Sequence, residues 1–177
     1  MREVVRRVGV SHKAPYRHFA DKEALLAAIA DEGFRDLTQA LQQAVDQANP
    51  DPQHRLAATG ISHVNWGISH GTHYRVMFGA SQGNLQAYPD LCRASDAAFQ
   101  VLVTTITQGQ EAQHSRTADP QTMATTAWSM VHGMVMLYLD GHLSEESALH
   151  LVQVGTQLLL GGLVQASPRD LSYGSEP

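Results

Sequence analysis

Residues that can bind a polyanion are gathered in one short stretch near the start of the chain, VGVSHKAPYRHFADKEALL at positions 8–26. Ser11 suits the N-cap of a short helix, whose free amide groups can hold a phosphate. Lys13 can donate to guanine O6 or N7, and the methyl group of Ala14 can contact a thymine methyl. Other polar side chains of the stretch can reach phosphates. The predicted DNA-contacting set is Ser11, His12, Lys13, Ala14, Tyr16, Arg17, His18 and Lys22.

The distribution of charge agrees with an anionic partner at this end. Residues 1–22 hold six basic and two acidic side chains, a net charge of +4, whereas the remaining residues carry −9. A basic head on an acidic body suits a protein that meets a polyanion with one end only. The alternative is a charged, frayed N-terminus, and charge alone does not separate the two.

The elements that position these residues are all predicted to be helices. Alternating apolar and polar runs joined by tight turns are absent, which argues against strands. Apolar residues instead recur at spacings of three and four. Asp119 followed by Pro120 is a typical helix start. The predicted helices cover residues 2–8, 11–19, 22–48, 53–69, 73–78, 89–110, 121–139 and 144–164.

The first two of these helices, separated by a turn at Gly9, have the outline of a helix-turn-helix. In that motif the first helix braces the second, whose N-terminal side chains enter the major groove. We therefore expect an all-α protein with a DNA-binding domain over residues 1–45. A helical ligand-binding and dimerisation domain over 46–166 and a disordered tail over 167–177 follow.

The block VGVSHKAPYRHFADKEALLAAIADEGF resembles the DNA-binding signature of the tetracycline-repressor (TetR) family of bacterial regulators. The matching residues are Gly9-Val10-Ser11, Tyr16-x-His18-Phe19 and Asp21-Lys22-Glu23-x-Leu25-Leu26. The resemblance implies that the recognition helix contacts bases, and that Tyr16 and Lys22 contact phosphates. It continues in HYRVMFG at 73–79 and in Trp128 with His132-Gly133, which resemble the ligand-binding domain variant named for its Trp-His-Gly motif.

The family's DNA-binding domain has three helices, and the first of them would precede Arg2. We therefore expect that helix to be missing from this chain, which would leave Val4, Val5, Val8 and Phe19 partly uncovered. Each Å² of apolar surface left in water forfeits about 25 cal/mol. This expectation leaves an alternative function open: a dimeric module that binds a small molecule but not DNA.

The rest of the resemblance concerns the body of the chain. It implies a homodimer built through the last two helices, and residues 128–139 are apolar nearly all round, as expected of a helix buried on both sides. Such a dimer would read a palindromic operator. The candidate pocket for a small-molecule effector is lined by His63, Trp66, His70, Met77, Trp128 and His132. The alternative is a core in which the histidines are hydrogen-bonded and the tryptophans simply pack.

The sequence gives little support for an enzyme, a metal-binding protein, or a membrane or secreted protein. No Gly-rich phosphate loop, nucleophile elbow or HExxH motif is present, so no enzyme is expected. His70 and His73 lack a cysteine or carboxylate at zinc spacing, so neither a metal nor a cofactor is expected. A single cysteine, Cys92, no membrane-length apolar run and no signal-peptide core predict a cytoplasmic protein. The predicted function is a ligand-responsive regulator, a repressor that releases its operator on binding a small molecule.

Overall fold

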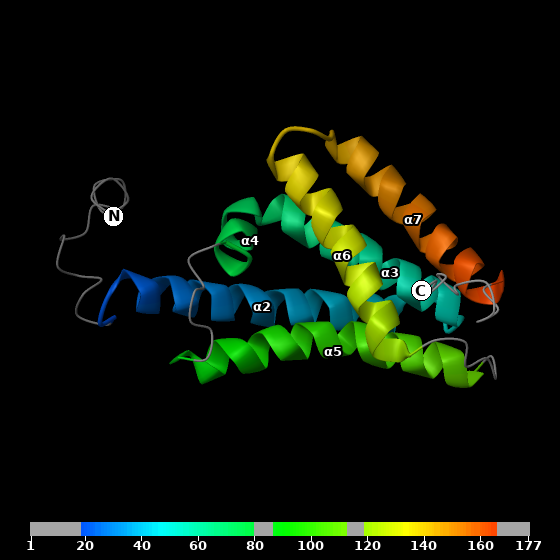
Figure 1. Ribbon diagram of the computed structural model, residues 1–177, viewed down its shortest axis with the longest axis horizontal. Coiled ribbons are helices and arrows are strands. Elements are labelled where there is room, and N and C mark those ends of the chain that lie inside the picture. The colour runs from blue at the N-terminus through cyan, green and yellow to red at the C-terminus, as the bar shows by residue number, and fades with distance from the viewer. Residues whose placement is uncertain (1–18, 80–86, 113–118, 166–177) are drawn as a thin grey trace, which may run out of the picture.

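The computed structural model describes residues 19–79, 87–112 and 119–165, with the backbone alone for 160–165. The described part is helical, with no strand (Figure 1). The two predicted helices before residue 19 and the tail after residue 166 lie outside the described residues. The helices are α2 (Lys22–Gln47), α3 (Pro52–Ser69), α4 (Gly71–Met77), α5 (Pro89–Ala112), α6 (Pro120–Leu139) and α7 (Glu145–Gln165).

Aspartate caps fix where three of these helices begin. The Asp21 carboxylate accepts a hydrogen bond from the backbone N–H of Ala24 at 2.8 Å, which starts α2. Asp51 does the same for α3 and Asp119 for α6, and a proline occupies the first turn of each. Such side chains satisfy amide groups that have no partner within the helix. The predicted helix from 22 onward and those that follow agree with the structure to within about two residues at most ends.

The largest difference at a helix start concerns α4, which begins at Gly71 rather than at residue 73. His70 ends α3 and also precedes α4, because its carbonyl accepts a hydrogen bond from the N–H of Tyr74 at 2.9 Å. Arg75 then ties α4 to the end of α6, since its Nη2 donates to the Leu139 carbonyl and to the Asp140 carboxylate, both at 2.6 Å. The short helix is thus held at both ends.

α2 is the long element on which the body is assembled. It lies beside α5 along the length of the molecule and also packs against α3 and α4, while α7 packs against α3 and α6 (Figure 1). The predicted boundary between residues 45 and 46 falls inside this helix. Its inward face consists of Ala27, Ala30, Gly33, Phe34, Leu37, Leu41 and Val45, all buried.

The core has two apolar clusters. The larger one surrounds Leu37, Tyr74 and Val135 and involves α2 to α7. The smaller one consists of Leu56, Leu102, Ile106, Ala124 and Ala127. Trp128 packs against both clusters, so it marks the seam between them. None of the described helices is both long enough and apolar enough to cross a membrane.

Candidate functional site

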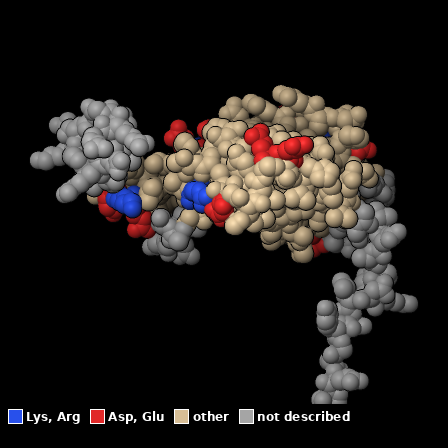
Figure 2. All heavy atoms as spheres, turned by 90° about the horizontal axis from the view of Figure 1, so that it is seen from above, with Lys and Arg blue, Asp and Glu red and all other residues tan. Residues whose placement is uncertain are grey.

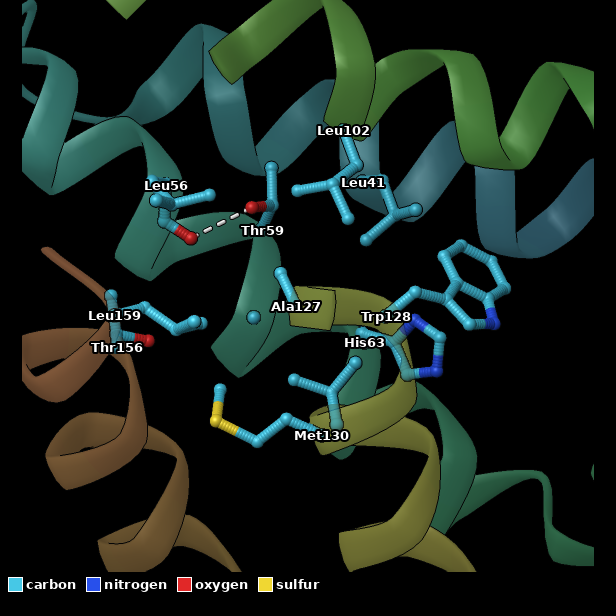
Figure 3. A pocket seen from close by; sticks show the side chains of 12 residues that line it. Leu41, Leu56, Thr59, His63, Leu102, Ala127, Trp128, Met130, Thr156 and Leu159 are labelled. Atoms are coloured by element: carbon cyan, nitrogen blue, oxygen red, sulfur yellow. Dashed lines mark hydrogen bonds between the residues drawn. The ribbon is translucent and has the colours of Figure 1, made fainter. Parts of the chain in front are cut away.

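A small, partly open cavity lies at the seam between the two apolar clusters, and α2, α3, α5, α6 and α7 all contribute to its wall (Figure 3). Its volume is about 20 Å³, which is room for about one water molecule. His63 and Trp128 lie together on one side, and Thr156 and Leu159 lie on the other. The lining residues are Leu41, Leu56, Thr59, Gly60, His63, Leu102, Ala127, Trp128, Met130, Val131, Thr156 and Leu159.

The wall of this cavity is apolar and carries no charged side chain. Its two hydroxyl groups already donate to backbone carbonyls of their own helices: Thr59 to Leu56 at 2.7 Å and Thr156 to Val152 at 2.8 Å. A threonine hydroxyl that donates back along its helix is satisfied as a donor. The imidazole of His63 is therefore the polar group of the wall best suited to recognise a ligand.

His63 is the first member of a hydrogen-bonded chain that joins three helices. Its Nε2 lies 2.9 Å from the Tyr74 hydroxyl, and that hydroxyl lies 2.9 Å from Nδ1 of His132. The three residues come from α3, α4 and α6. His63 is 2% exposed and Tyr74 is fully buried, whereas His132 is partly exposed. The chain therefore runs from the cavity wall toward the surface.

Burial keeps all three groups uncharged near neutral pH. Burial, with a smaller contribution from repulsion by His132, lowers the pKa of His63 to about 3. Burial also lowers the pKa of His132 and raises the pKa of Tyr74 above its ordinary value. Taking a charged form out of water costs free energy, so each group keeps its neutral form. The chain thus offers neutral donors and acceptors to its surroundings.

Aromatic rings connect the hydrogen-bonded residues His63, Tyr74 and His132 to α2. The rings of His63 and Trp128 meet edge to face, with centroids 4.7 Å apart and planes at 85°. Phe78 lies against both Tyr74 and His132, with centroids 4.6 Å away in each case. Phe78 also packs edge to face with Phe34 in α2, with centroids 5.4 Å apart. A continuous set of packed rings therefore leads from the cavity to α2.

The six predicted pocket residues do not form one site. His63 and Trp128 line the cavity, and His132 reaches it through Tyr74. Trp66 and His70 stack on each other at 4.7 Å and border an open groove between α2 and α3. Met77 is buried against α2, where a Cβ on Gly33 would lie 2.6 Å from its sulfur.

Sequence reasoning missed two polar residues of the cavity wall, Thr59 and Thr156. Thr59 could have been found, because Leu56, Thr59, Gly60 and His63 recur at helical spacing and so share one face. Tyr74 can be grouped with the pocket histidines from the sequence, but its hydrogen bonds could not be predicted, since its two partners are 11 and 58 residues away in the chain. Among the described residues, no three His, Cys, Asp or Glu side chains come together as a metal site requires.

Of the predicted DNA-contacting residues, Lys22 alone lies within the described part of the chain. It is the first residue of α2 and is exposed. The other seven, Ser11 to His18 without Pro15, lie outside the described residues. The end of α2 that carries Lys22 directly follows the predicted recognition helix.

Comparison with known proteins identifies family models that match this sequence. The family model described as the tetracyclin repressor-like C-terminal domain matches residues 56–156, and that of the bacterial regulatory proteins of the tetR family matches residues 1–29. The first of these ranges includes Trp128 and His132-Gly133. No curated protein matches significantly.

Solved structures agree with these matches. A protein of unknown function from a Rhodococcus species is 31% identical over 93% of this chain and 84% of its own, with a TM-score of 0.79. The TetR family transcriptional regulator PfmR from Thermus thermophilus is 20% identical over 89% and 85%, with a TM-score of 0.74. The transcriptional regulator FadR from Bacillus subtilis, solved with stearoyl-CoA, is 15% identical over 90% and 86%, with a TM-score of 0.75. The last two likenesses show a shared fold.

The C-terminal family model covers more than half of the 177 residues, and the N-terminal one covers the helix-turn-helix sequence. The chain therefore belongs to the TetR family and is a ligand-responsive, DNA-binding transcriptional regulator.

Proposed function

We propose that the protein is a repressor that binds a palindromic operator as a homodimer and releases it when a small molecule enters the cavity. The observation that carries this proposal is the apolar cavity at the seam of the core, with His63 as its polar handle. Residues 1–45 would then read DNA and residues 46–166 would bind the ligand and form the dimer, with α2 shared between them.

The surface of α6 and α7 supports the dimer. The exposed large apolar side chains of the described residues are Leu137, Leu151 and Leu158, at 46%, 38% and 71% exposure, and all three lie on these helices. α6 has no charged residue, and α7 has none after Glu146. Figure 2 shows a broad face of the body with few charged side chains. Apolar surface of this kind marks an interface, and a closed dimer uses the same patch on both subunits.

The packing of α4 supports a link between the cavity and DNA. Tyr74 bonds to His63 on one face of this helix, and Phe78, just beyond its end, packs against Phe34 of α2. A ligand that displaces the His63 side chain changes the position of Tyr74 and hence the contact of α4 with α2. Ligand binding then favours a spacing of the recognition helices that no longer fits the operator, which is a shift between two populations.

Selection from a random pool of duplex DNA, with the 177-residue chain at physiological salt, tests the proposal. Enrichment of a palindrome whose affinity falls steeply with salt is the expected result. Lys13→Ala should relax the sequence preference, whereas Lys22→Ala should weaken binding to all DNA alike. A chain that forms dimers yet enriches no sequence would favour the alternative, a binding module without DNA affinity.

The dimer has its own test. Leu158→Glu places a charge on the most exposed of the described apolar side chains of α7, and sedimentation velocity should then show a monomer. Gln157→Glu, at the neighbouring exposed position, is the matched control for added charge. If Leu158→Glu remains dimeric at micromolar concentration, the interface lies elsewhere.

A further inference from the structure

The Tyr74 hydroxyl has one hydrogen to share between His63 and His132. This limits which ring nitrogens of the two histidines can carry a proton. If Nε2 of His63 carries its proton and donates to Tyr74, the hydroxyl donates to Nδ1 of His132, so His132 carries its proton on Nε2. If the hydroxyl donates to His63 instead, both histidines carry their protons on Nδ1. A neutral imidazole has one donor and one acceptor nitrogen. The two rings therefore take the same tautomer.

Mixed tautomers are disfavoured because each of them leaves one polar group of the three residues without a partner. If both rings donate to Tyr74, its own hydrogen loses its acceptor, and if both rings accept, one of them goes unpaired. Both bonds are 2.9 Å long, and Tyr74 and His63 are buried. A buried polar group without a partner is costly enough to reduce such a state about tenfold or more. The two matched arrangements are therefore the populated ones.

His63 is the member of this hydrogen-bonded chain that lines the cavity. Its Nε2 bonds to Tyr74, whereas no hydrogen bond of its Nδ1 is found among the described residues. This nitrogen is an acceptor in one matched arrangement and a donor in the other. A polar group that bonds to it selects one arrangement, and Tyr74 passes that selection to His132.

We propose that the effector is an uncharged, largely apolar molecule whose polar group hydrogen bonds to Nδ1 of His63, and that this bond sets the tautomers of both histidines through Tyr74. The proposal rests on the cavity being the effector site of the proposed function. The wall contains no charge that could pair with an ionised ligand, and an unpaired charge in apolar surroundings is strongly disfavoured. Met130 is in the wall, and its unbranched side chain can move aside for a ligand larger than water.

The relay is tested first in the protein without ligand. Long-range ¹H–¹⁵N correlation spectra of ¹⁵N-labelled protein at about pH 7.5 report which ring nitrogen carries the proton in each histidine. His63→Gln and His132→Gln variants assign the two signals. The expected result is the same tautomer, or the same ratio of tautomers, in both rings. Different tautomers in the two rings would overturn the relay.

The effector class is tested with three probes of similar size: acetophenone, benzoate and toluene. Acetophenone can only accept, so it should convert both rings to the Nδ1-protonated form. Benzoate should bind at least about tenfold more weakly, because its charge finds no partner in the wall. Toluene should bind without converting the tautomers. Benzoate binding as tightly as acetophenone, or no binding of any probe at millimolar concentration, would overturn the assignment of the effector class.

Tyr74→Phe separates the relay from simple proximity. In this variant acetophenone should still convert His63 but leave His132 unchanged, provided that circular dichroism shows a folded protein. Conversion of both rings in the variant would overturn the relay, and the wild-type spectra decide the question if the variant does not fold. These experiments do not involve DNA. Their results therefore remain valid even if the selection from random duplex DNA enriches no operator. Conversely, if the protein binds an operator but none of the three probes binds in the cavity, the proposed class of effector is rejected and the proposed DNA-binding function is kept.

Discussion

Buried His63 should make the protein lose stability in mild acid. Burial lowers the pKa of His63 from 6.5 to about 3 in the folded protein. Between these two values the unfolded chain takes up a proton that the folded protein does not. The contribution of His63 to stability is therefore complete above about pH 6.5 and declines as the pH falls toward about 3. Replacing His63 with a side chain that cannot take up a proton should remove this part of the pH dependence.

The expected size follows from those two pKa values. Each pH unit within the window costs about 1.4 kcal/mol, so lowering the pH from about 7 to about 5 should reduce the free energy of unfolding by about 2 kcal/mol through His63 alone. Burial lowers the pKa of His132 as well, so that residue changes stability in the same direction. His63→Gln keeps an amide group near the Tyr74 hydroxyl and isolates the contribution of His63.

Urea unfolding at a series of pH values, with fixed protein concentration, measures the effect. The wild-type protein should lose about 2 kcal/mol more than His63→Gln between about pH 7 and about pH 5. His142→Gln, an exposed histidine in the turn between α6 and α7, should retain the wild-type slope. If the wild type and His63→Gln lose stability in parallel, His63 is not held neutral by burial, and the account of the site given above fails.

Further predictions concern packing and capping. Tyr74→Phe leaves two histidine nitrogens without their partner, so the free energy of unfolding in urea at about pH 7.5 should fall by about 1–3 kcal/mol. Gly67→Ala places a Cβ 2.6 Å from Val135 Cγ1 and should cost about 1–3 kcal/mol; in a double-mutant cycle Val135→Ala should relieve part of this cost, and strict additivity would refute the clash. Asp21→Ala removes the cap of α2 and should cost about 1 kcal/mol, with Asp46→Ala near the exposed end of the same helix as the control.

Much of the fold could be predicted because capping and turn residues near each end fix many of its helix boundaries. Asp119 with Pro120 starts α6 where the sequence predicts it. Asp140 and Gly141 end that helix, and Gly141 adopts a φ of 79°, a left-handed conformation that favours glycine. The start of α4 was harder to predict, because His70 makes no side-chain cap and the helix follows α3 without a linker. Local signals thus predict helices well where a cap or a turn is present.

The site was less predictable, because its contacts join positions far apart in the chain. The predicted pocket set includes His63, Trp66 and His70, which lie on or next to the same helix. In the structure His63 faces the cavity, while Trp66 and His70 border the groove between α2 and α3. Which face of α3 meets the cavity depends on how α2, α6 and α7 pack around it. That information lies in tertiary packing rather than in the spacing of residues along one helix.

The continuity of α2 has a consequence for how such regulators can be recombined. The helix has 26 residues and is roughly 39 Å long, and its buried positions run from Ala27 to Val45. A chimera joined after residue 45 would replace this whole inward face at once and leave the rest of the core without its complement. A junction just before Lys22 would keep the face intact and fall in the turn capped by Asp21. The segment that can be exchanged between such regulators is thus the one before α2. The helix itself must be kept together with the helices α3 to α7 against which it packs.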